Sequence, residues 1–248
     1  MAHKKSNPRN LLVLPVHNEN NQVAQVCKDL KVFLHTNRFT SVLVVDDGST
    51  DGTPESFRRC LAGVSRTSVL ALPDNGGKGR AIRIAFAKAK ADFFVFMDGD
   101  LAYSFDHLQP MLAALEKHDM VIGSRSMAPQ PQGGLPARRA FLGWAFNRLA
   151  CLLLGFDYPD TQAGLKGFTR GGGQKLFSIQ KLNDFAFDAE LLYLAKKLGL
   201  SVGQIPAQVS GQHTYKTSQV KLLVDSLRCL MDFLLVRWWS ATRAYNLP

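Results

Sequence analysis

The sequence predicts an α/β protein with a mostly parallel, Rossmann-like central sheet that helices cover on both faces. Short, continuous apolar runs alternate with helical patterns through the first half of the chain, as in parallel strands that are buried on both sides. The chain has 248 residues, of which 46% are hydrophobic, so it is long enough to bury a sizeable core. Polar clusters follow the predicted strands where they end, which is where ligands bind in such sheets.

Apolar runs bounded by turn residues or helical patterns predict the strands. The expected strands are residues 11–14, 42–45, 69–72, 93–97, 120–123, 166–169 and 202–205. Helices are expected where apolar residues recur every three or four positions, and Thr53 with Pro54 forms an N-cap and first-turn pair. The expected helices are residues 19–34, 53–61, 80–90, 108–117, 138–154, 187–198 and 218–244. We interpret residues 127–136 as a long loop and residues 171–173, all glycine, as a break.

No stretch of the sequence has the composition of a linker between domains. We therefore expect one catalytic domain over residues 1–217 and a C-terminal amphipathic helix over 218–248. The apolar side of that helix carries Leu227, Leu234 and Trp238, and it either docks on the core or lies at a membrane interface. No uncharged apolar run reaches the ~18 to 20 residues that span a bilayer, and no signal-peptide core follows the start. We therefore expect a soluble or peripheral protein.

The 30 Lys and Arg against 20 Asp and Glu give a net charge of +10, which favours an anionic partner. The cations are spread along the chain, so a nucleic-acid-binding face is disfavoured and no nucleic acid is expected as a partner. The cysteines are far apart and form no CxxC pair, so we expect neither a zinc site nor a disulfide framework. They are interpreted as small core residues in a reducing compartment: Cys27, Cys60, Cys151 and Cys229.

Two acidic pairs follow predicted strands. Asp98 and Asp100, separated by one glycine, can hold Mg²⁺ or Mn²⁺ between their carboxylates, or can simply form a turn. Asp46 and Asp47 can accept hydrogen bonds from a nucleoside, or can cap a tight turn. Each pair alone leaves both interpretations open.

Basic residues supply candidate phosphate contacts. Lys78 lies in a glycine-rich loop before a helix, which suits a phosphate, although the spacing is not that of a Walker A loop. No GxGxxG follows the first strand, which disfavours a dinucleotide dehydrogenase. A second basic set would suit phosphates on two partners: Arg125, Arg138, Arg139, Lys166 and Arg170.

Four motifs in order resemble the family two glycosyltransferases of the GT-A fold over residues 10–125. They are Pro15-Val16-His17-Asn18-Glu19, Asp46-Asp47-Gly48-Ser49, Asn75-Gly76-Gly77-Lys78-Gly79 and Asp98-Gly99-Asp100. Later segments resemble the branch that makes dolichyl- or polyprenyl-phosphate sugars: Gly123-Ser124-Arg125 and Asp160-Thr161-Gln162-Ala163-Gly164-Leu165-Lys166. The second of these is closer to the dolichyl-phosphate glucose synthase pattern than to the mannose synthase pattern.

The resemblance implies an inverting transfer of a hexose from UDP-glucose or GDP-mannose to a polyprenyl or dolichyl phosphate. It also implies a peripheral position on the cytoplasmic face of a membrane, and it allows an integral membrane partner. The implied nucleoside contacts are Pro15, His17, Glu19 and Asp47 or Asp46, with Lys78 near the base or the phosphates. The implied metal ligands are Asp98 and Asp100, and the implied contacts to the lipid phosphate are Arg125, Arg139 and Lys216.

Several alternatives remain open at this stage. A lipid phosphate is already anionic at neutral pH and needs no protein base, whereas a saccharide or protein acceptor would need one, with Asp188 or Glu190 as candidates. A nucleotidyltransferase would also use paired carboxylates and a basic loop. Ala102 stands where the mannose synthases usually carry Gln, which keeps open a catalytically impaired relative.

Overall fold

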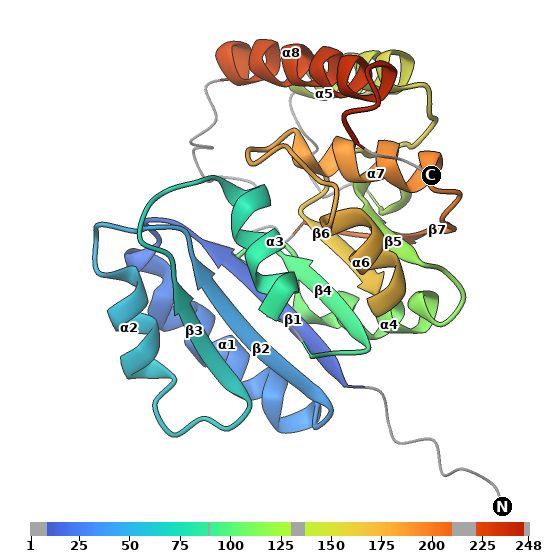
Figure 1. The fold of residues 1–248 in the computed structure, drawn as a ribbon. Coiled ribbons are helices and arrows are strands. Elements are labelled where there is room, and N and C mark those ends of the chain that lie inside the picture. The colour runs from blue at the N-terminus through green and yellow to red at the C-terminus, as the bar shows by residue number, and fades with distance from the viewer. Residues whose placement is uncertain (1–8, 89, 130–136, 210–221, 246–248) are drawn as a thin grey trace, which may run out of the picture.

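A central mixed sheet organises the computed structural model, which describes residues 9–88, 90–129, 137–209 and 222–245, without the side chains of 137–140 and 222–225 (Figure 1). The sheet has seven strands in the order β3-β2-β1-β4-β6-β5-β7. The strands are β1 Asn10–Val16, β2 Thr40–Asp46, β3 Thr67–Ala71, β4 Phe93–Met97, β5 Met120–Ser124, β6 Leu165–Thr169 and β7 Val202–Pro206. Each predicted strand overlaps one of these, so the α/β class is confirmed.

All strand pairings are parallel except those of β6, which runs antiparallel to both of its neighbours, β4 and β5. The carboxyl ends of β1, β2, β4 and β5 therefore meet at one edge of the sheet. We call this edge the rim. The carboxyl end of β6 lies at the opposite edge, because Thr169 pairs with Phe93 at the start of β4.

Helices cover both faces of the sheet, as the continuous apolar strands predict (Figure 1). One face carries α1 Val23–Thr36, α2 Thr53–Cys60 and α4 Leu108–Leu115. The other carries α3 Lys78–Lys88, α6 Arg170–Phe177 and α7 Phe187–Lys197. Beyond α7, α5 Ala137–Leu154 and α8 Leu222–Ala241 pack on each other as an outer layer, at the top of Figure 1. Short 3-10 turns are η1 Asn20–Gln22, η2 Phe105–His107 and η3 Arg125–Met127.

Strand β1 shows why its sequence is apolar at successive positions. Leu12 and Leu14 pack into the core beneath α1, whereas Val13 faces the core beneath α3, and each is completely buried. Because successive side chains of a strand point to opposite faces, a sheet covered twice needs apolar residues at every position.

The prediction of a break at residues 171–173 is wrong, because these glycines lie inside α6. The helix begins where the Thr169 hydroxyl accepts a hydrogen bond from the Gly172 N–H over 3.0 Å. A Cβ at Gly172 would lie 2.6 Å from the Asp119 carbonyl oxygen, and one at Gly173 would lie 2.4 Å from the Phe86 ring. Close packing, not chain termination, explains these glycines.

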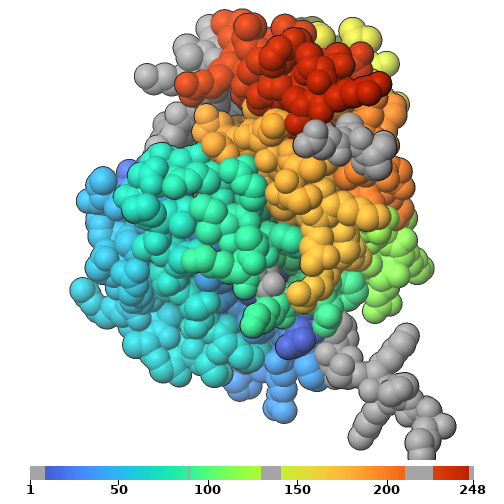
Figure 2. Space-filling model, viewed as in Figure 1, coloured from blue at the N-terminus to red at the C-terminus, as the bar shows by residue number. Residues whose placement is uncertain are grey.

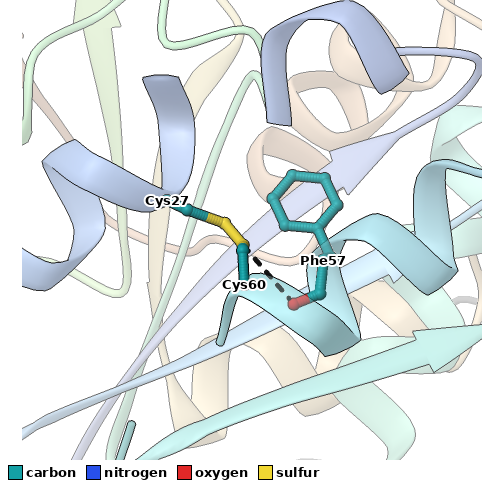
Figure 3. Close-up of a disulfide and its surroundings, with 3 residues drawn as sticks. All are labelled: Cys27, Phe57 and Cys60. Atoms are coloured by element: carbon teal, nitrogen blue, oxygen red, sulfur yellow. Dashed lines mark hydrogen bonds between the residues drawn. A yellow bond between two sulfur atoms is a disulfide. The ribbon is translucent and has the colours of Figure 1, made fainter. Parts of the chain in front are cut away.

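The expectation that all cysteines are free is also wrong. Cys27 of α1 and Cys60 of α2 form a disulfide with a Cα–Cα distance of 6.4 Å (Figure 3). Both helices cover the same face of the sheet, which brings residues 33 positions apart into contact. Cys151 and Cys229 are buried thiols outside that disulfide, as expected.

The C-terminal helix is confirmed over the narrower range of α8. Its Phe233 and Val236 are completely buried against the core, whereas Met231 and Trp238 are 62% and 59% exposed. In the described ranges, no helix combines the length and apolar character needed to cross a bilayer. The predicted boundary at 217/218 lies outside the described residues and stays a prediction.

Candidate active site

The loops that follow β1 and β2 are joined at the rim by side-chain bonds. Asn18 adopts a left-handed conformation with φ 53°, which its short polar side chain tolerates. Its backbone N–H donates to the Ser49 hydroxyl over 2.8 Å, and its side-chain oxygen accepts from the Thr50 N–H over 2.9 Å. The Glu19 N–H donates to the Thr53 hydroxyl over 2.9 Å, which ties the first loop to the start of α2.

His17 is fixed between the two loops. Its Nε2 lies 3.1 Å from the side-chain amide nitrogens of both Asn18 and Asn75, which can only donate. We therefore assign the proton to Nδ1, which donates to the Asp47 carbonyl oxygen over 2.9 Å. Together with Pro15 and Glu19, His17 is half-buried at the rim, so the structure brings together the predicted nucleoside contacts from β1.

The two carboxylates at the end of β2, Asp46 and Asp47, have different surroundings. Asp47 accepts hydrogen bonds from the backbone N–H groups of Gly76 and Gly77 over 3.1 and 2.7 Å, so it shapes the glycine-rich loop. Asp46 is buried and accepts from the Ser49 N–H over 3.0 Å, while its Oδ1 has no hydrogen-bond partner among the described residues. Gly77 has φ +92°, and a Cβ there would lie 2.5 Å from the Asn183 carbonyl oxygen, so the loop requires glycine.

The Asp98-Gly99-Asp100 turn lies beside the end of β1. A Cβ at Gly99 would lie 2.4 Å from the Pro15 carbonyl oxygen, so only glycine lets these ends approach. A Cβ at Gly164 would lie 1.8 Å from Asp98 Oδ2, so the backbone of residue 164 closes one side of the carboxylate. Asp100 Oδ1 accepts the Ala102 N–H over 3.0 Å.

The acidic pair was predicted to hold a metal ion. Within the described ranges, no three or more His, Cys, Asp or Glu side chains are grouped to hold a metal. The carboxylates of Asp98 and Asp100 are nevertheless hard oxygen ligands, which suit Mg²⁺ or Mn²⁺ when a substrate diphosphate completes the coordination. The donor set therefore fits a cation shared between protein and nucleotide.

Four side chains form an alternating row of charges, which we call the charge chain: Lys166, Asp188, Lys78 and Asp98. Lys78 Nζ lies 2.6 Å from Asp98 Oδ1 and 3.8 Å from Asp188 Oδ2. Lys166 Nζ lies 2.6 Å from Asp188 Oδ1 and donates to the Ala163 carbonyl over 2.7 Å. Burial opposes the charge on Lys78, but the Asp98 and Asp188 carboxylates outweigh it and raise the pKa of Lys78.

The charge chain changes the interpretation of the second basic set. Lys166 is completely buried and paired with Asp188, so it is not a surface phosphate contact. Arg170 follows β6 and lies at the edge of the sheet opposite the rim. Both residues differ from the prediction because β6 is antiparallel to its neighbours. Its first residues therefore lie at the rim, and its last residues lie at the opposite edge.

The two candidate bases are held by other groups. Asp188 accepts from Lys166 and is also close to Lys78. Glu190 accepts hydrogen bonds from the backbone N–H groups of Lys181 and Leu182 and from the Tyr245 hydroxyl, at 2.8–2.9 Å. Burial raises the pKa of Glu190, although these hydrogen bonds pull it back toward the ionised form. Glu190 therefore connects the start of α7 to the chain after α8.

Arg125 follows β5 and is fixed by Asp160. Arg125 Nε and Nη2 donate to the two Asp160 carboxylate oxygens over 2.7 and 2.9 Å, and its backbone N–H donates to the same carboxylate over 3.0 Å. Burial would raise the pKa of Asp160, but Arg125 outweighs it and lowers the pKa. Both Arg125, after β5, and Asp98, after β4, therefore lie at the rim.

Sequence reasoning missed the side chains that position these groups. Asp160 was recognised only as part of a motif, not as the partner of Arg125. The role of Asn147 in α5 was also missed: its side-chain oxygen accepts from the Thr161 N–H and hydroxyl over 3.0 and 2.9 Å, and its amide donates to the Tyr158 carbonyl over 2.9 Å. The motif around Asp160 was the available signal, but nothing in it names a partner in α5. The side chain of Arg139 and all of Lys216 lie outside the described residues.

Relatives with assigned functions are similar across most of the chain. The chain is 31% identical over 237 residues to glycosyltransferase AglD of Haloferax volcanii, covering 93% of this chain and 37% of AglD. It is 32% identical over 212 residues to a dolichyl-phosphate beta-glucosyltransferase of Drosophila melanogaster, covering 78% of this chain and 64% of that protein. The chain thus spans about a third of the length of AglD and somewhat under two thirds of the length of the Drosophila protein.

Solved structures share the fold. The glucosyl-3-phosphoglycerate synthase of Mycobacterium tuberculosis, in complex with Mn²⁺, UDP-glucose and phosphoglyceric acid, matches with a TM-score of 0.67 and 21% identity, over 98% of this chain and 81% of that chain. A mannosyltransferase from Pyrobaculum calidifontis in complex with GDP-Man and Mn²⁺ matches with a TM-score of 0.60 and 18% identity, over 96% and 65% of the chains. These likenesses confirm the GT-A fold. The glycosyl transferase family 2 profile covers residues 11–174, and the chain belongs to that family.

Proposed function

We propose that the protein transfers a hexose from a nucleotide sugar to a polyprenyl or dolichyl phosphate, with inversion at the anomeric carbon. Relatives named dolichyl-phosphate beta-glucosyltransferase favour this acceptor and favour glucose, and hence UDP-glucose, over mannose. The phosphate oxygen of the acceptor attacks the anomeric carbon as the bond to the nucleoside diphosphate breaks. The reaction is then a single displacement without a covalent enzyme intermediate.

The engagement of both candidate bases is the observation that carries this choice. Asp188 is paired with Lys166, and Glu190 is occupied by two backbone N–H groups and Tyr245. A saccharide hydroxyl needs a base within hydrogen-bond reach, whereas a phosphate monoester is already ionised at neutral pH. The engagement of both predicted bases, as seen in the described part of the chain, therefore favours a phosphate acceptor over a hydroxyl acceptor.

The rim is proposed to bind the donor. Pro15, His17 and Glu19 would contact the nucleoside, while Asp47 maintains the loop that would present Lys78 to the diphosphate. Asp46 Oδ1 lacks a partner among the described residues, so it offers a second acceptor for a nucleoside N–H. Asp98 and Asp100 would hold Mg²⁺ or Mn²⁺, and the chemistry such a cation supplies is charge stabilisation on the departing diphosphate.

Arg125 is proposed to bind the acceptor phosphate, together with Arg139 and Lys216. The Asp160 carboxylate uses Nε and Nη2 of Arg125, which leaves the Nη1 edge of the guanidinium for an anion. The Arg125 side chain is 51% exposed, so a ligand can reach it from solvent. An orientation fixed before binding lowers the entropic cost of holding the phosphate in line with the anomeric carbon.

The outer layer of α5 and α8 is proposed to rest on the cytoplasmic surface of a membrane, where a lipid phosphate would be found. The layer exposes large apolar side chains, and Figure 2 shows α8 forming one end of the molecule. The exposed residues are Phe141, Leu142, Trp144, Leu149, Leu152, Leu227, Met231, Leu234, Leu235 and Trp238. Arg148, Arg228 and Arg237 are exposed on the same helices, as expected for a surface that meets anionic lipid.

A transfer assay tests the proposal. Radiolabelled UDP-glucose and GDP-mannose are each incubated with a short polyprenyl phosphate and either Mn²⁺ or EDTA. We expect label from UDP-glucose in the organic phase, lost with EDTA and reduced at least about a hundredfold in Asp100→Ala, because the cation loses one of its two protein ligands. Glu55→Ala, which removes an exposed carboxylate from α2, is the matched control and should keep full activity.

Two other results would contradict the proposal. Cation-dependent release of nucleoside diphosphate without an organic-phase product would point to a saccharide or protein acceptor. No transfer and no release with either donor would point to a catalytically impaired relative.

A further inference from the structure

We propose that Lys78 stands in for the divalent cation at Asp98 when the site is empty, and that this exchange makes cation and donor binding depend on each other. The inference rests on the proposed donor site. It adds that a cation alone binds weakly because it must displace an ammonium group. The donor diphosphate then gives that ammonium group a new anion to pair with.

The position of Lys78 supports the exchange. Its Nζ is 2.6 Å from Asp98 Oδ1, one of the oxygens that a cation would use. Lys78 is the first residue of α3 and directly follows the glycine-rich loop, so its ammonium group lies at the rim. Its side chain is 16% exposed, and four flexible methylene groups carry the charge.

The charges of the surrounding groups decide which lysine moves. Lys78 and Lys166 balance Asp98 and Asp188, and Asp100 adds a third negative charge within electrostatic reach of Lys78. A divalent cation added to this set leaves an excess of positive charge unless an ammonium group withdraws or an anion enters.

Lys166 cannot be the group that withdraws. It has no exposed surface and is held by the Ala163 carbonyl as well as by Asp188. Lys78 is therefore the mobile member of the charge chain, and Asp188, 3.8 Å away, keeps it near the rim after it leaves Asp98.

Direct measurement of Mn²⁺ binding, by calorimetry or by the electron paramagnetic resonance signal of free Mn²⁺, tests the exchange without any turnover. Lys78→Met keeps an unbranched side chain, one atom shorter than that of lysine, and removes its charge. In the absence of nucleotide, we expect this variant to bind Mn²⁺ at least about tenfold more tightly than the wild type, because no ammonium group competes for the Asp98 carboxylate. UDP affinity measured without metal should fall.

Lys88→Met is the matched control, because it removes one charge from the exposed end of the same helix and should leave Mn²⁺ affinity unchanged. Lys78→Gln provides a second uncharged variant if Lys78→Met does not fold, and it should show the same direction of change. Equal Mn²⁺ affinity in the wild type and a folded, uncharged variant would overturn the inference while leaving the donor site intact. Absence of Mn²⁺ binding in all variants, with and without UDP, would overturn the metal site itself and the inference with it.

Discussion

Arg125 takes its orientation from Asp160, a residue 35 positions further along the chain. Two side-chain bonds and one backbone bond converge on a carboxylate that is 6% exposed. We expect Asp160→Asn to raise the KM for polyprenyl phosphate about tenfold and to leave the KM for UDP-glucose unchanged, because an amide cannot accept from both guanidinium nitrogens. Steady-state kinetics with each substrate varied in turn would measure this difference.

Asp157→Asn is the control for that variant, because Asp157 forms an exposed ion pair with Arg148 that should contribute under about 1 kcal/mol to the unfolding free energy.

Asp160→Asn should cost about 1–3 kcal/mol of unfolding free energy at neutral pH, since it leaves a buried group partly unpaired. Arg125 lowers the folded-state pKa of Asp160, so its stabilisation is present above the unfolded value of 3.8 and is lost as the pH falls through the folded value. Denaturation curves that differ equally at pH 7 and well below pH 3.8 would contradict this account.

Helix α5 holds the segment from Tyr158 to Thr161 through Asn147, beside the proposed acceptor site. We expect Asn147→Ala to cost about 1–3 kcal/mol and to raise the KM for the acceptor, because the segment that carries Asp160 loses its attachment to α5. Asn147→Asp keeps an acceptor for Thr161 but loses the amide donor to the Tyr158 carbonyl and to the Cys151 sulfur, so its KM should lie between those of the wild type and Asn147→Ala. Identical kinetics in the two variants would show that the Thr161 bonds do not position Asp160.

The strands and the rim were predictable from sequence because each depends on local pattern. Apolar runs mark buried strands, and acidic or glycine-rich turns mark their ends. The direction of β6 was not predictable, because side-chain alternation is the same in parallel and antiparallel strands. That direction buries Lys166 beneath the rim and places Arg170 at the far edge. The pairs Arg125–Asp160 and Lys78–Asp98 depend on how distant elements approach each other, which periodicity does not record.

At the scale of the whole molecule, the outer layer and the proposed acceptor site are physically connected. Helix α5 belongs to the layer that exposes Trp144, and the same helix holds the segment that carries Asp160 through Asn147. Helix α8 completes the layer and buries Phe233 against the core. A lipid phosphate at the membrane surface would thus lie near the helices that help to form its binding site.

The double variant Trp144→Ala with Trp238→Ala separates membrane contact from chemistry. These indoles are 63% and 59% exposed, so their loss should leave unfolding free energy nearly unchanged. We expect sedimentation with anionic vesicles to fall about tenfold, because the layer loses its aromatic anchors. The KM for polyprenyl phosphate in vesicles should rise, while the KM for a short, water-soluble polyprenyl phosphate should not change.

Phe39→Ala is the control. It removes an aromatic side chain that is 59% exposed and lies just before β2, at the edge of the sheet opposite the rim, and it should change neither vesicle binding nor KM. Unchanged vesicle binding in the double variant would contradict the membrane assignment, and binding only to native membranes would point to an integral membrane partner.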